Sequence, residues 1–372
     1  MPRTVNQEAP RSRRATLADV ARAAGVSTST ASLAYSRSGP VAETTRQRIF
    51  DAATALGYGG PDPTARSLRR GRTGVVAVIL GDRLRYAFSD PMEVLLLDAL
   101  SEELEGLGAS LLLVPGATQG ASRLASVPLD AAVFADCGHL QDPLLTLLRA
   151  RHTPVVGVDG PRAPDVPFVG IDDEGSTAEL IRHLLGLGHR ELAVLALPLL
   201  LDGYRGPVRH DRLAEGYEVP RRRIDGVRSA LAGSGLQAAA RARYLETAAN
   251  TAEEGERVAT ELLRGPDRPT ALVAQSDVLA LGCLRAAAAC GLRVPADVSV
   301  AGFDGIDLPL LDGSVLTTIV QPIAEKGATA GRHVAALLAG ERPADVMLPV
   351  SLRIGTTTGT VGRADRTGRS TG

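Results

Sequence analysis

A stretch close to the N-terminus carries two helix caps separated by a glycine, an order that strongly limits the possible folds. Thr16 can cap a first helix, with Asp19 at the third helical position in a capping-box arrangement. Gly25 suits the left-handed backbone that ends a helix, and Ser27 can cap a second helix soon after it. The apolar residues between the caps recur on one helical face, at Leu17, Val20, Ala21 and Ala24. This spacing predicts two helices joined by a tight turn.

The second helix has the features of a helix that enters a DNA groove. Its inward side is expected to carry Ala31, Ala34 and Tyr35. Its outward face holds small, uncharged side chains at Thr28, Ser29, Ser32 and Leu33, with Thr30 near the boundary. Small side chains let a helix sink into the major groove. A third helix follows, with its buried side expected at Ile49, Phe50, Ala53 and Leu56. This pattern predicts a helix-turn-helix DNA-binding domain, in preference to a generic three-helix bundle.

The charge distribution favours the same interpretation. The chain carries a formal charge of −1, but its first 73 residues hold 12 arginines and 5 acidic residues, which gives +7. The remaining 299 residues hold 29 basic and 37 acidic residues, which gives −8. A basic head on an acidic body is typical of a nucleic-acid-binding protein, with the attraction to phosphate confined to the head.

Other bulk features narrow the class of protein. The length of 372 residues allows two or three domains. No apolar run is long enough to span a membrane, and the polar start MPRTVNQEAPRSRR lacks the apolar segment of a secretory signal. Cys137, Cys283 and Cys290 are odd in number and far from any CxxC spacing, so they are expected to be reduced thiols that bind no metal. These features predict a cytoplasmic, nucleoid-associated protein without a cofactor.

The linker GGPDPTARSLRRGRT, between head and body, can hold a short helix. Asp62 is a good N-cap, Pro63 suits the first helical position and Gly71 suits the end. A helix of about two turns is marginal in water unless something packs on it. Four arginines crowd this helix, so a negatively charged partner would favour it. The alternative is a solvated linker between domains.

The motifs TLADVARAAGVSTSTAS, PVAETTRQRI, ALGY and ARSL together resemble the head and hinge of the lactose-repressor (LacI/GalR) family, and the likeness extends to about Thr358. The resemblance implies a dimer whose hinge helices pair in the DNA minor groove, where Leu68 would wedge between base pairs. Two departures are one extra residue in GGPDP and Leu33, which stands where the lactose repressor carries an arginine. Leucine cannot bond a guanine edge but could contact a thymine methyl group. The residues expected to contact DNA are Thr16, Ser27, Thr28, Ser29, Thr30, Ser32, Leu33, Thr45, Arg46, Ala65, Arg66 and Leu68.

Beyond the linker, apolar runs of strand length alternate with helical segments. The runs include VVAVIL at 75–80, PVVGVD, ELAVLAL, ALVAQ and VSVAGFD. Buried strands alternating with helices predict parallel sheets with right-handed crossovers, and two such series predict an α/β core of two doubly wound lobes. Ligands of open parallel sheets bind beyond the carboxyl ends of the strands, so the lobes are expected to face each other across a cleft.

The resemblance supplies the topology, a periplasmic-binding-protein-like core whose chain crosses between the lobes near Gly170, Thr318 and Arg342. The expected parts are a disordered basic tail (1–14), the head (15–60), the hinge (61–73), the core (74–358) and a flexible tail (359–372). Lobe 1 would hold about 74–170 and 319–342, and lobe 2 about 171–318 and 343–358. The stretch 198–222 is expected to be a long functional loop, followed by a helix from Arg223 to Ala232.

Candidate effector contacts lie at the strand ends. Asp159 closes PVVGVD, Asp304 closes VSVAGFD, and Ser276 and Asp277 follow ALVAQ. The resemblance implies that Arg223 grips sugar hydroxyls or a carboxylate. It also places Asn250 where the lactose repressor stacks a tryptophan on its sugar. Because the chain has no tryptophan, stacking is assigned to an aromatic residue among Tyr86, Phe88, Phe168 and Phe303.

Simpler roles remain open for three of these residues. Asp277 could cap the helix that starts at Val278, Arg223 could be a surface salt-bridge partner, and Asp304 could be a plain turn residue.

Enzymatic interpretations are disfavoured because GxSxG, HExxH and P-loop motifs are absent. We therefore expect a ligand-responsive, sequence-specific transcriptional regulator, with a repressor favoured. It would bind a pseudopalindromic operator as a homodimer and respond to a sugar or another small polar effector. The alternatives are a sugar-binding transport protein, against which the basic head and the lack of a signal peptide argue, and an effector-independent DNA-bending protein.

Overall fold

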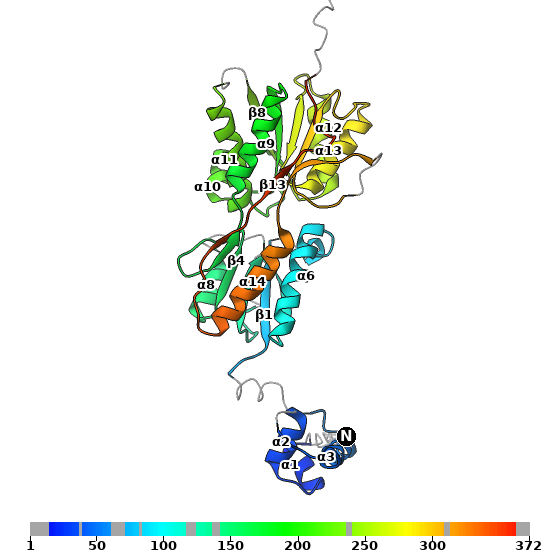
Figure 1. Ribbon diagram of the computed structural model, residues 1–372, viewed down its shortest axis with the longest axis vertical. Helices are drawn as coiled ribbons and strands as arrows, with labels where there is room; N and C mark the ends of the chain where they lie inside the picture. Colours follow the sequence, from blue (N-terminus) through cyan, green and yellow to red (C-terminus); the bar gives the residue numbers. More distant parts are fainter. Residues whose placement is uncertain are drawn as a thin grey trace, which may run out of the picture. The chain divides into compact units, whose positions relative to one another are not determined.

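The computed structural model divides the chain into two compact units, Met1–Thr73 and Gly74–Gly372 (Figure 1). The described residues are 15–36, 39–60, 71–81, 84–116, 124–135, 142–235, 240–308 and 313–361. The basic tail and the predicted hinge helix, with Ala65, Arg66 and Leu68, lie outside the described residues.

The described residues of the first unit form three helices. These are α1 (Leu17–Ala23), α2 (Thr28–Ser36) and α3 (Glu43–Ala55). The capping box is complete, because the Thr16 hydroxyl accepts from the backbone N–H of Asp19 at 3.3 Å and the Asp19 carboxylate accepts from that of Thr16 at 3.0 Å. Gly25 takes a φ of 63°, as the end of α1 requires. The Ser27 hydroxyl accepts from the backbone N–H of Thr30 at 3.0 Å.

The core of this unit is made of small side chains. Its buried residues are Val20, Ala21, Ala24, Ala31, Ala34, Ile49 and Ala53. Tyr35 closes one side, with its ring edge-to-face against Phe50 at 5.2 Å and Tyr58 at 5.9 Å. Leu56, expected on the buried side of the third helix, is 42% exposed because it lies beyond the last helical residue.

Lobe 1 of the second unit is built on a parallel sheet with the strand order β12-β5-β4-β3-β1-β2. Its strands are β1 (Val75–Leu80), β2 (Ser110–Pro115), β3 (Ala131–Ala135), β4 (Val155–Val158), β5 (Phe168–Gly170) and β12 (Val346–Met347). Among the described residues of this lobe, the helices are α5 (Leu84–Ala87), α6 (Pro91–Gly106), α8 (Pro143–Ala150) and α14 (Ile323–Leu338). Alternate residues of β1 face opposite layers: Val76 and Val78 pack with α6 and α14, and Ala77 and Ile79 pack with α8.

Lobe 2 repeats this plan on a larger sheet with the order β13-β11-β10-β9-β6-β8-β7, in which both edge strands are antiparallel. Its strands are β6 (Glu191–Ala196), β7 (Gly206–Pro207), β8 (Arg241–Glu246), β9 (Ala271–Ala274), β10 (Ser299–Asp304), β11 (Thr317–Val320) and β13 (Ser351–Arg353). Its helices are α9 (Asp173–Gly186), α10 (His210–Glu215), α11 (Glu218–Gly233), α12 (Ala252–Arg264) and α13 (Asp277–Ala289). Residues of α9 and α11 belong to one core layer, and residues of α12 and α13 to the other. The predicted α/β class with two doubly wound lobes is confirmed.

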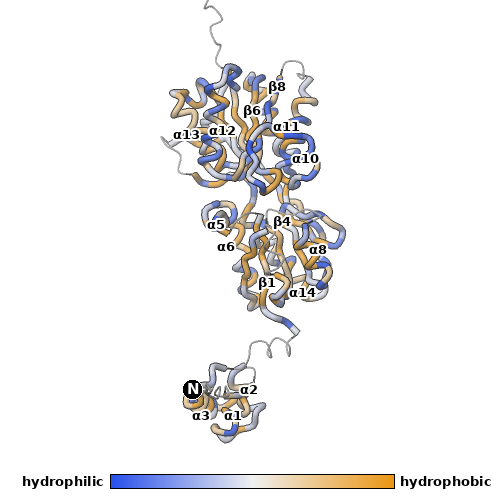
Figure 2. The backbone as a smooth tube through the Cα atoms, turned by 180° about the vertical axis from the view of Figure 1, so that it is seen from behind, coloured by the Kyte–Doolittle hydropathy of each residue, from blue (hydrophilic) through white to orange (hydrophobic). Residues whose placement is uncertain are grey.

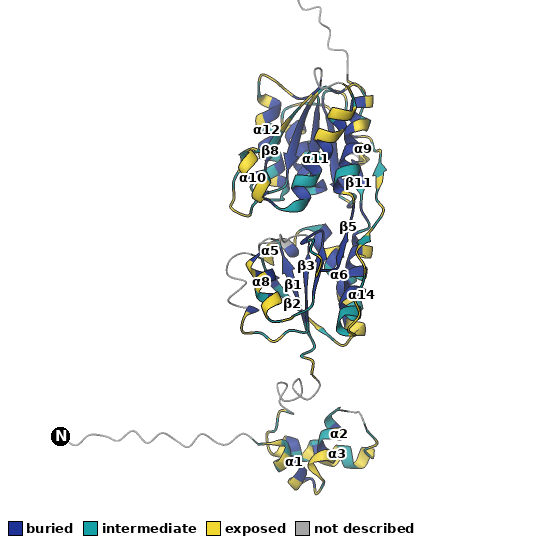
Figure 3. Cartoon of the chain, turned by 90° about the vertical axis from the view of Figure 1, so that its left-hand side faces the viewer, coloured by how far each residue is buried: buried dark blue, intermediate teal, exposed yellow. Residues whose placement is uncertain are grey.

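The central strands of both lobes are hydrophobic and buried. Figure 2 shows the hydrophobic residues of β1 and β6, and Figure 3 shows that β1 and β3 are buried. Both faces of these strands are covered by helices, which explains why their sequences are continuous apolar runs without alternation. Among the described helices, none is long and apolar enough to cross a membrane.

The chain passes between the lobes three times, and the third passage differs from its expected position. The first follows β5 at Ile171, and the second follows β11 at 321–322. The third, expected near Arg342, lies at 348–350, because Val346 and Met347 still pair with β5 of lobe 1. Residues 359–361, placed in the predicted flexible tail, are held against lobe 2, because the backbone N–H of Val361 donates to the carbonyl oxygen of Leu187 at 3.1 Å; residues 362–372 lie outside the described residues.

The stretch predicted as a long loop contains structure of its own. It holds β7, α10 and the start of α11, which begins at Glu218 and not at Arg223. We call residues 198–217 the β6–α11 excursion. It begins beyond the carboxyl end of β6, on the side of lobe 2 where the chain crosses to lobe 1.

Candidate functional site

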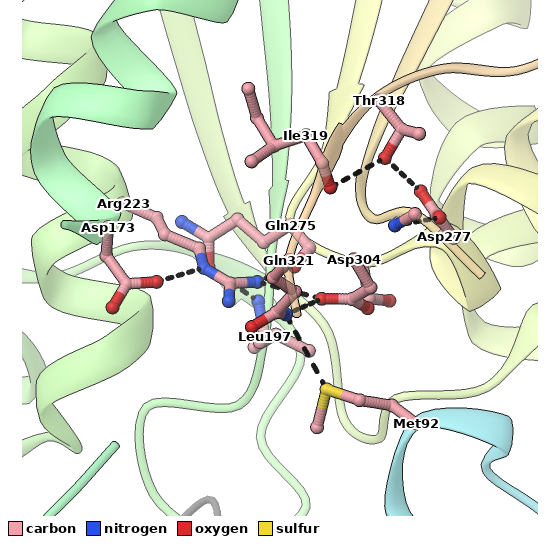
Figure 4. Close-up of polar contacts among 12 residues, drawn as sticks. Met92, Asp173, Leu197, Arg223, Gln275, Asp277, Asp304, Thr318, Ile319 and Gln321 are labelled. Carbon is pink, nitrogen blue, oxygen red and sulfur yellow. Dashed lines mark hydrogen bonds and ion pairs between the residues drawn. The ribbon is translucent and has the colours of Figure 1, made fainter. Parts of the chain in front are cut away.

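A buried polar network joins the lobes where the carboxyl ends of their strands meet. Lys326 on α14 contacts the carboxylate of Asp159, at the end of β4, and the side-chain oxygen of Gln321. Gln321, on the second passage between the lobes, donates to Asp304 Oδ1 at 2.7 Å (Figure 4). All four side chains are at least nine-tenths buried. Lobe 1 therefore reaches lobe 2 through an unbroken chain of polar contacts.

Arg223 continues this network inside lobe 2. Its Nε donates to Asp173 Oδ1 at 2.9 Å, and its Nη1 donates to the backbone carbonyl oxygen of Gln275. The same nitrogen lies 3.7 Å from Asp304 Oδ1 (Figure 4). The guanidinium carbon lies 3.6 Å from the centre of the Phe303 ring. Burial raises the pKa of Asp173, against the attraction of Arg223. Arg223 is only 3% exposed, so the alternative of a surface salt-bridge partner is wrong.

Two carboxylates of the network sit on unusual backbone. Asp159 has a φ of 57° and Asp304 a φ of 124°, values that non-glycine residues seldom adopt. Asp159 Oδ1 is also buried without a hydrogen-bond partner among the described residues. Backbone strain and an unsatisfied buried oxygen each cost free energy, and such features concentrate at binding sites. Asp304 is therefore more than a plain turn residue.

Asp277 does not cap α13, the simpler role that was left open for it. The cap of α13 is Ser276, whose hydroxyl accepts from the backbone N–H of Leu279 at 3.1 Å. Asp277 instead accepts from the Thr318 hydroxyl at 2.6 Å and from the backbone N–H groups of Gly305 and Ile306 at 2.8 and 2.9 Å. Burial raises its pKa to about 7. Asp277 thus fixes the loop that follows Asp304.

A second chain of hydrogen bonds, which we call the Asn250 bridge, spans the lobes. Asn250 in lobe 2 donates to Asp90 Oδ2 in lobe 1 at 3.0 Å and accepts from the Ser276 hydroxyl. Asp90 caps α6 through the backbone N–H of Met92 at 2.9 Å. The bridge therefore connects the N-terminus of α6 to that of α13. Burial raises the pKa of Asp90.

The aromatic residues considered for stacking on the effector do not all lie at the central network. Phe303 has one ring face covered by Arg223, and Phe168 has Arg162 at 4.0 Å. Phe88 is 69% exposed just beyond α5, and the side chain of Tyr86 is outside the described residues. The assignment of a stacking residue stays a prediction.

Sequence reasoning missed five members of the two networks: Asp90, Asp173, Gln275, Gln321 and Lys326. Two signals were available. Asp90 precedes a proline, which is the pattern of an N-cap followed by proline at the first helical position. Lys326 is the single lysine of a chain that otherwise uses arginine.

The head presents its predicted DNA-facing residues on α2. Thr28, Ser29 and Leu33 are exposed, whereas Thr30 and Ser32 are half-buried. Arg46 on α3, half-buried, donates to the carbonyl oxygen of Ala34 at 3.3 Å. Thr45 beside it is half-buried too. Arg46 therefore ties α3 to α2.

A helix-turn-helix head on a two-lobed core of parallel sheets defines a class of protein, the helix-turn-helix regulators with a periplasmic-binding-protein-like core. Residues 16–60 match the bacterial regulatory proteins of the lacI family, and residues 181–358 match a periplasmic binding protein-like domain. A helix-turn-helix transcriptional regulator of Mycolicibacterium smegmatis is 38% identical over 331 residues, which cover 86% of this chain and 89% of that protein. The regulator IpsA of Corynebacterium glutamicum is 34% identical over 326 residues, 85% of this chain and 89% of that protein.

Solved structures agree with this relationship. The lac repressor dimer bound to operator and the anti-inducer ONPF aligns with a TM-score of 0.72 and 25% identity, covering 93% of this chain and 100% of that one. The complex of the transcriptional regulator CelR with cellobiose aligns with a TM-score of 0.64 and 26% identity, covering 92% and 100%. The chain belongs to the LacI family and is a DNA-binding transcriptional regulator.

Proposed function

We propose that this protein is a homodimeric repressor whose operator affinity is set by a small polar effector, a sugar or a similar polyol, bound between the lobes. The observation that carries the proposal is the buried network of Asp159, Lys326, Gln321, Asp304 and Arg223, which draws charged side chains from both lobes to one place. Burying so many charged groups away from water costs desolvation free energy, and buried ion pairs add little net stability to a fold. A binding role explains their presence better than a structural one.

The chemistry of the network suits hydroxyl groups. Carboxylates accept from hydroxyls and a guanidinium donates to them, in charge-assisted hydrogen bonds. Asp159 Oδ1 has an unfilled acceptor site, and Arg223 and Asp304 lie side by side. The CelR complex holds cellobiose, a neutral sugar, in a protein of the same architecture. This supports a neutral polyhydroxylated effector for the present chain.

Effector binding would act on DNA affinity by changing how the lobes meet. Both the central network and the Asn250 bridge cross between the lobes, so a ligand that replaces these contacts changes the balance between two lobe arrangements. The regulator would then couple two distinct sites through one bistable element. Repression is supported by the CytR repressor of Escherichia coli, which is 30% identical over 328 residues, 84% of this chain and 86% of that protein.

A second copy of the chain is supported by an apolar surface on lobe 1. Leu84, Phe88, Val94 and Leu95 of the α5–α6 region are 36 to 69% exposed. Exposed apolar side chains on neighbouring helices are a common feature of interfaces. Two heads would then read the two half-sites of a pseudopalindromic operator.

Leu68 in the hinge would wedge into the minor groove, and Leu68→Ala is expected to weaken operator binding while leaving the dimer intact.

The effector assignment is tested with Asp304→Asn. Arg223 also neutralises the buried Asp173, so Arg223→Ala would leave a carboxylate unpaired and disturb the fold. Asp304→Asn keeps the shape of the side chain but removes a charged acceptor. We expect operator binding as in the wild type and effector affinity weakened by roughly 1.5–3 kcal/mol. The measurement is a DNA-release titration with an effector found by thermal-shift screening of sugars.

The matched control is Arg228→Ala, on the same helix as Arg223 but half-exposed. It should release DNA at the wild-type effector concentration. If Asp304→Asn also does so, the effector site lies elsewhere. If no sugar or polyol stabilises the wild type or releases its DNA, the sugar assignment is wrong.

A further inference from the structure

The exposed face of α2 lacks the groups that form two hydrogen bonds with one base. The helix reads TSTASLAYS, so it carries no arginine, lysine, asparagine or glutamine. Guanine is usually read by arginine or lysine, and adenine by asparagine or glutamine, each through paired hydrogen bonds in the major groove. Hydroxyl groups contact several bases equally well. Polar contacts from this helix therefore discriminate weakly between base pairs.

One side chain on this face does offer a selective contact. Leu33 is 37% exposed, and its side chain lies next to Gly39. An exposed leucine on a DNA-facing surface gains nothing from water or from phosphate. The one apolar group that a base pair presents in the major groove is the C5 methyl of thymine.

Gly39 holds the leucine in place. A Cβ atom built at Gly39 would lie 3.0 Å from Leu33 Cδ2 and 3.4 Å from Cδ1. The two residues therefore touch, and a larger residue at 39 would push the leucine side chain. The Ser36 hydroxyl also donates to the backbone oxygen of Leu33 at 3.3 Å, at the end of the helix. The proximity of Gly39 limits where the leucine side chain can lie, which reduces the entropy cost of packing against DNA.

We propose that Leu33 selects a thymine in each operator half-site by packing on its C5 methyl group, and that Gly39 positions Leu33 for this contact. The inference rests on operator binding by α2 as proposed above. It adds that the methyl group, and not a hydrogen bond to a guanine edge, carries the base selectivity of this helix.

The experiment begins with selection of operator DNA from random duplexes by the full-length protein. Each thymine of the selected half-site is then replaced by uracil, which removes only the methyl group and keeps every hydrogen-bonding atom. One such replacement should weaken binding by about fourfold per half-site, the factor expected from one methyl group returned to water. The other replacements should have little effect.

Three variants assign the effect to its residue. Leu33→Ala should bind thymine and uracil operators equally. Ser29→Ala, on the same face, is the matched control: it should bind more weakly overall and keep the full preference for thymine. Gly39→Ala should reduce the preference while the thermal unfolding of the head stays close to that of the wild type, because residue 39 does not belong to the buried core of the head.

Several outcomes would overturn the inference. Uracil tolerated at every position, a selected half-site without thymine, or a uracil penalty that survives in Leu33→Ala would each exclude the methyl contact. Selection that enriches no sequence at all would instead overturn operator binding itself, and the inference with it. The two failures are therefore distinguishable.

Discussion

Lys326 and Asp159 form an ion pair with both side chains at most 6% exposed, inside lobe 1 and next to the passage to lobe 2. Removal of one partner leaves the other charge buried without compensation, which usually costs about 3–5 kcal/mol. Removal of both charges leaves no such penalty. Asparagine also tolerates the positive φ at residue 159.

Lys326→Met should therefore lower the free energy of unfolding of the core by about 3–5 kcal/mol, and Asp159→Asn with Lys326→Met should recover most of the loss. Urea denaturation of the full chain measures both. Arg332→Met, on the same helix, is the control, because its ion pairs are about half-exposed and should contribute at most about 1 kcal/mol. A double variant as unstable as Lys326→Met would show that packing, not charge, governs this position.

Asp277 makes stability depend on pH in an unusual direction. Its pKa is raised by burial to about 7, from 3.8. Between these values the folded chain keeps the proton and the unfolded chain has lost it, so folding binds a proton. The contribution of this group to stability is therefore complete below about pH 4 and is lost as the pH rises to about 7.

Asp277→Asn imitates the protonated form, because its amide can donate to the Thr318 hydroxyl while its oxygen accepts from Gly305 and Ile306. As the pH rises from 4 to 7, the free energy of unfolding of the variant should increase relative to that of the wild type, by several kcal/mol at most, because each pKa unit corresponds to about 1.4 kcal/mol. Urea titrations of both proteins at pH 5, 6, 7 and 8 give this difference. A difference that does not change with pH would mean that Asp277 ionises as freely in the folded chain as in the unfolded one.

At the scale of elements, the β6–α11 excursion is tied to lobe 2 by Arg212. This side chain donates to Glu246 at 2.7 Å and to Asp202 at 2.7 Å, and it lies 4.3 Å from the Tyr204 ring. Arg212 lowers the pKa of Asp202 to about 2. Most of α10 around Arg212 is exposed (Figure 3), so this buried anchor is what holds the short helix in place.

The far end of the excursion reaches lobe 1. Tyr217 packs against the hydrophobic cluster that α8 covers. Tyr217→Ala should loosen this contact and speed hydrogen exchange at the backbone N–H of Val166, which donates to Ala163 in the adjoining turn, by about tenfold. Leu201→Ala, in the exposed part of the same excursion, is the control. Equal exchange in the wild type and Tyr217→Ala would show that the excursion does not restrain the lobes.

The elements that the sequence predicts well are those with strong local signals. Thr16, Gly25 and Ser27 mark the head by their caps, and continuous apolar runs mark the central strands. The third passage between the lobes was misplaced because β12 is only two residues long, and its pairing with β5 joins positions far apart in the chain.

Site residues at strand ends were predictable because a parallel sheet gathers them at one edge. The partners of Asp159, Asp304 and Asn250 were not, because Lys326, Gln321 and Asp90 come from other parts of the chain and no local signal pairs them with these residues. Such partners are fixed by tertiary packing, which periodicity and capping signals do not encode.

At the scale of the whole molecule, the division of charge sets how DNA affinity responds to salt. The first 73 residues carry +7 and the remainder −8, so attraction to phosphate comes from the head alone. If the protein binds as the proposed dimer, operator affinity should fall with salt at a log–log slope on the order of −5 or steeper. Arg48→Gln, exposed on α3, should make the slope shallower by about one unit for each phosphate that the arginine no longer neutralises. Arg264→Gln, exposed at the end of α12 in the acidic core, should leave it unchanged, because a counterion released from DNA requires a positive charge at the DNA surface. A nearly flat salt dependence of the wild type, or an equal effect of the two substitutions in a binding titration from 50 to about 300 mM salt, would show that the basic head does not engage phosphate as its charge implies.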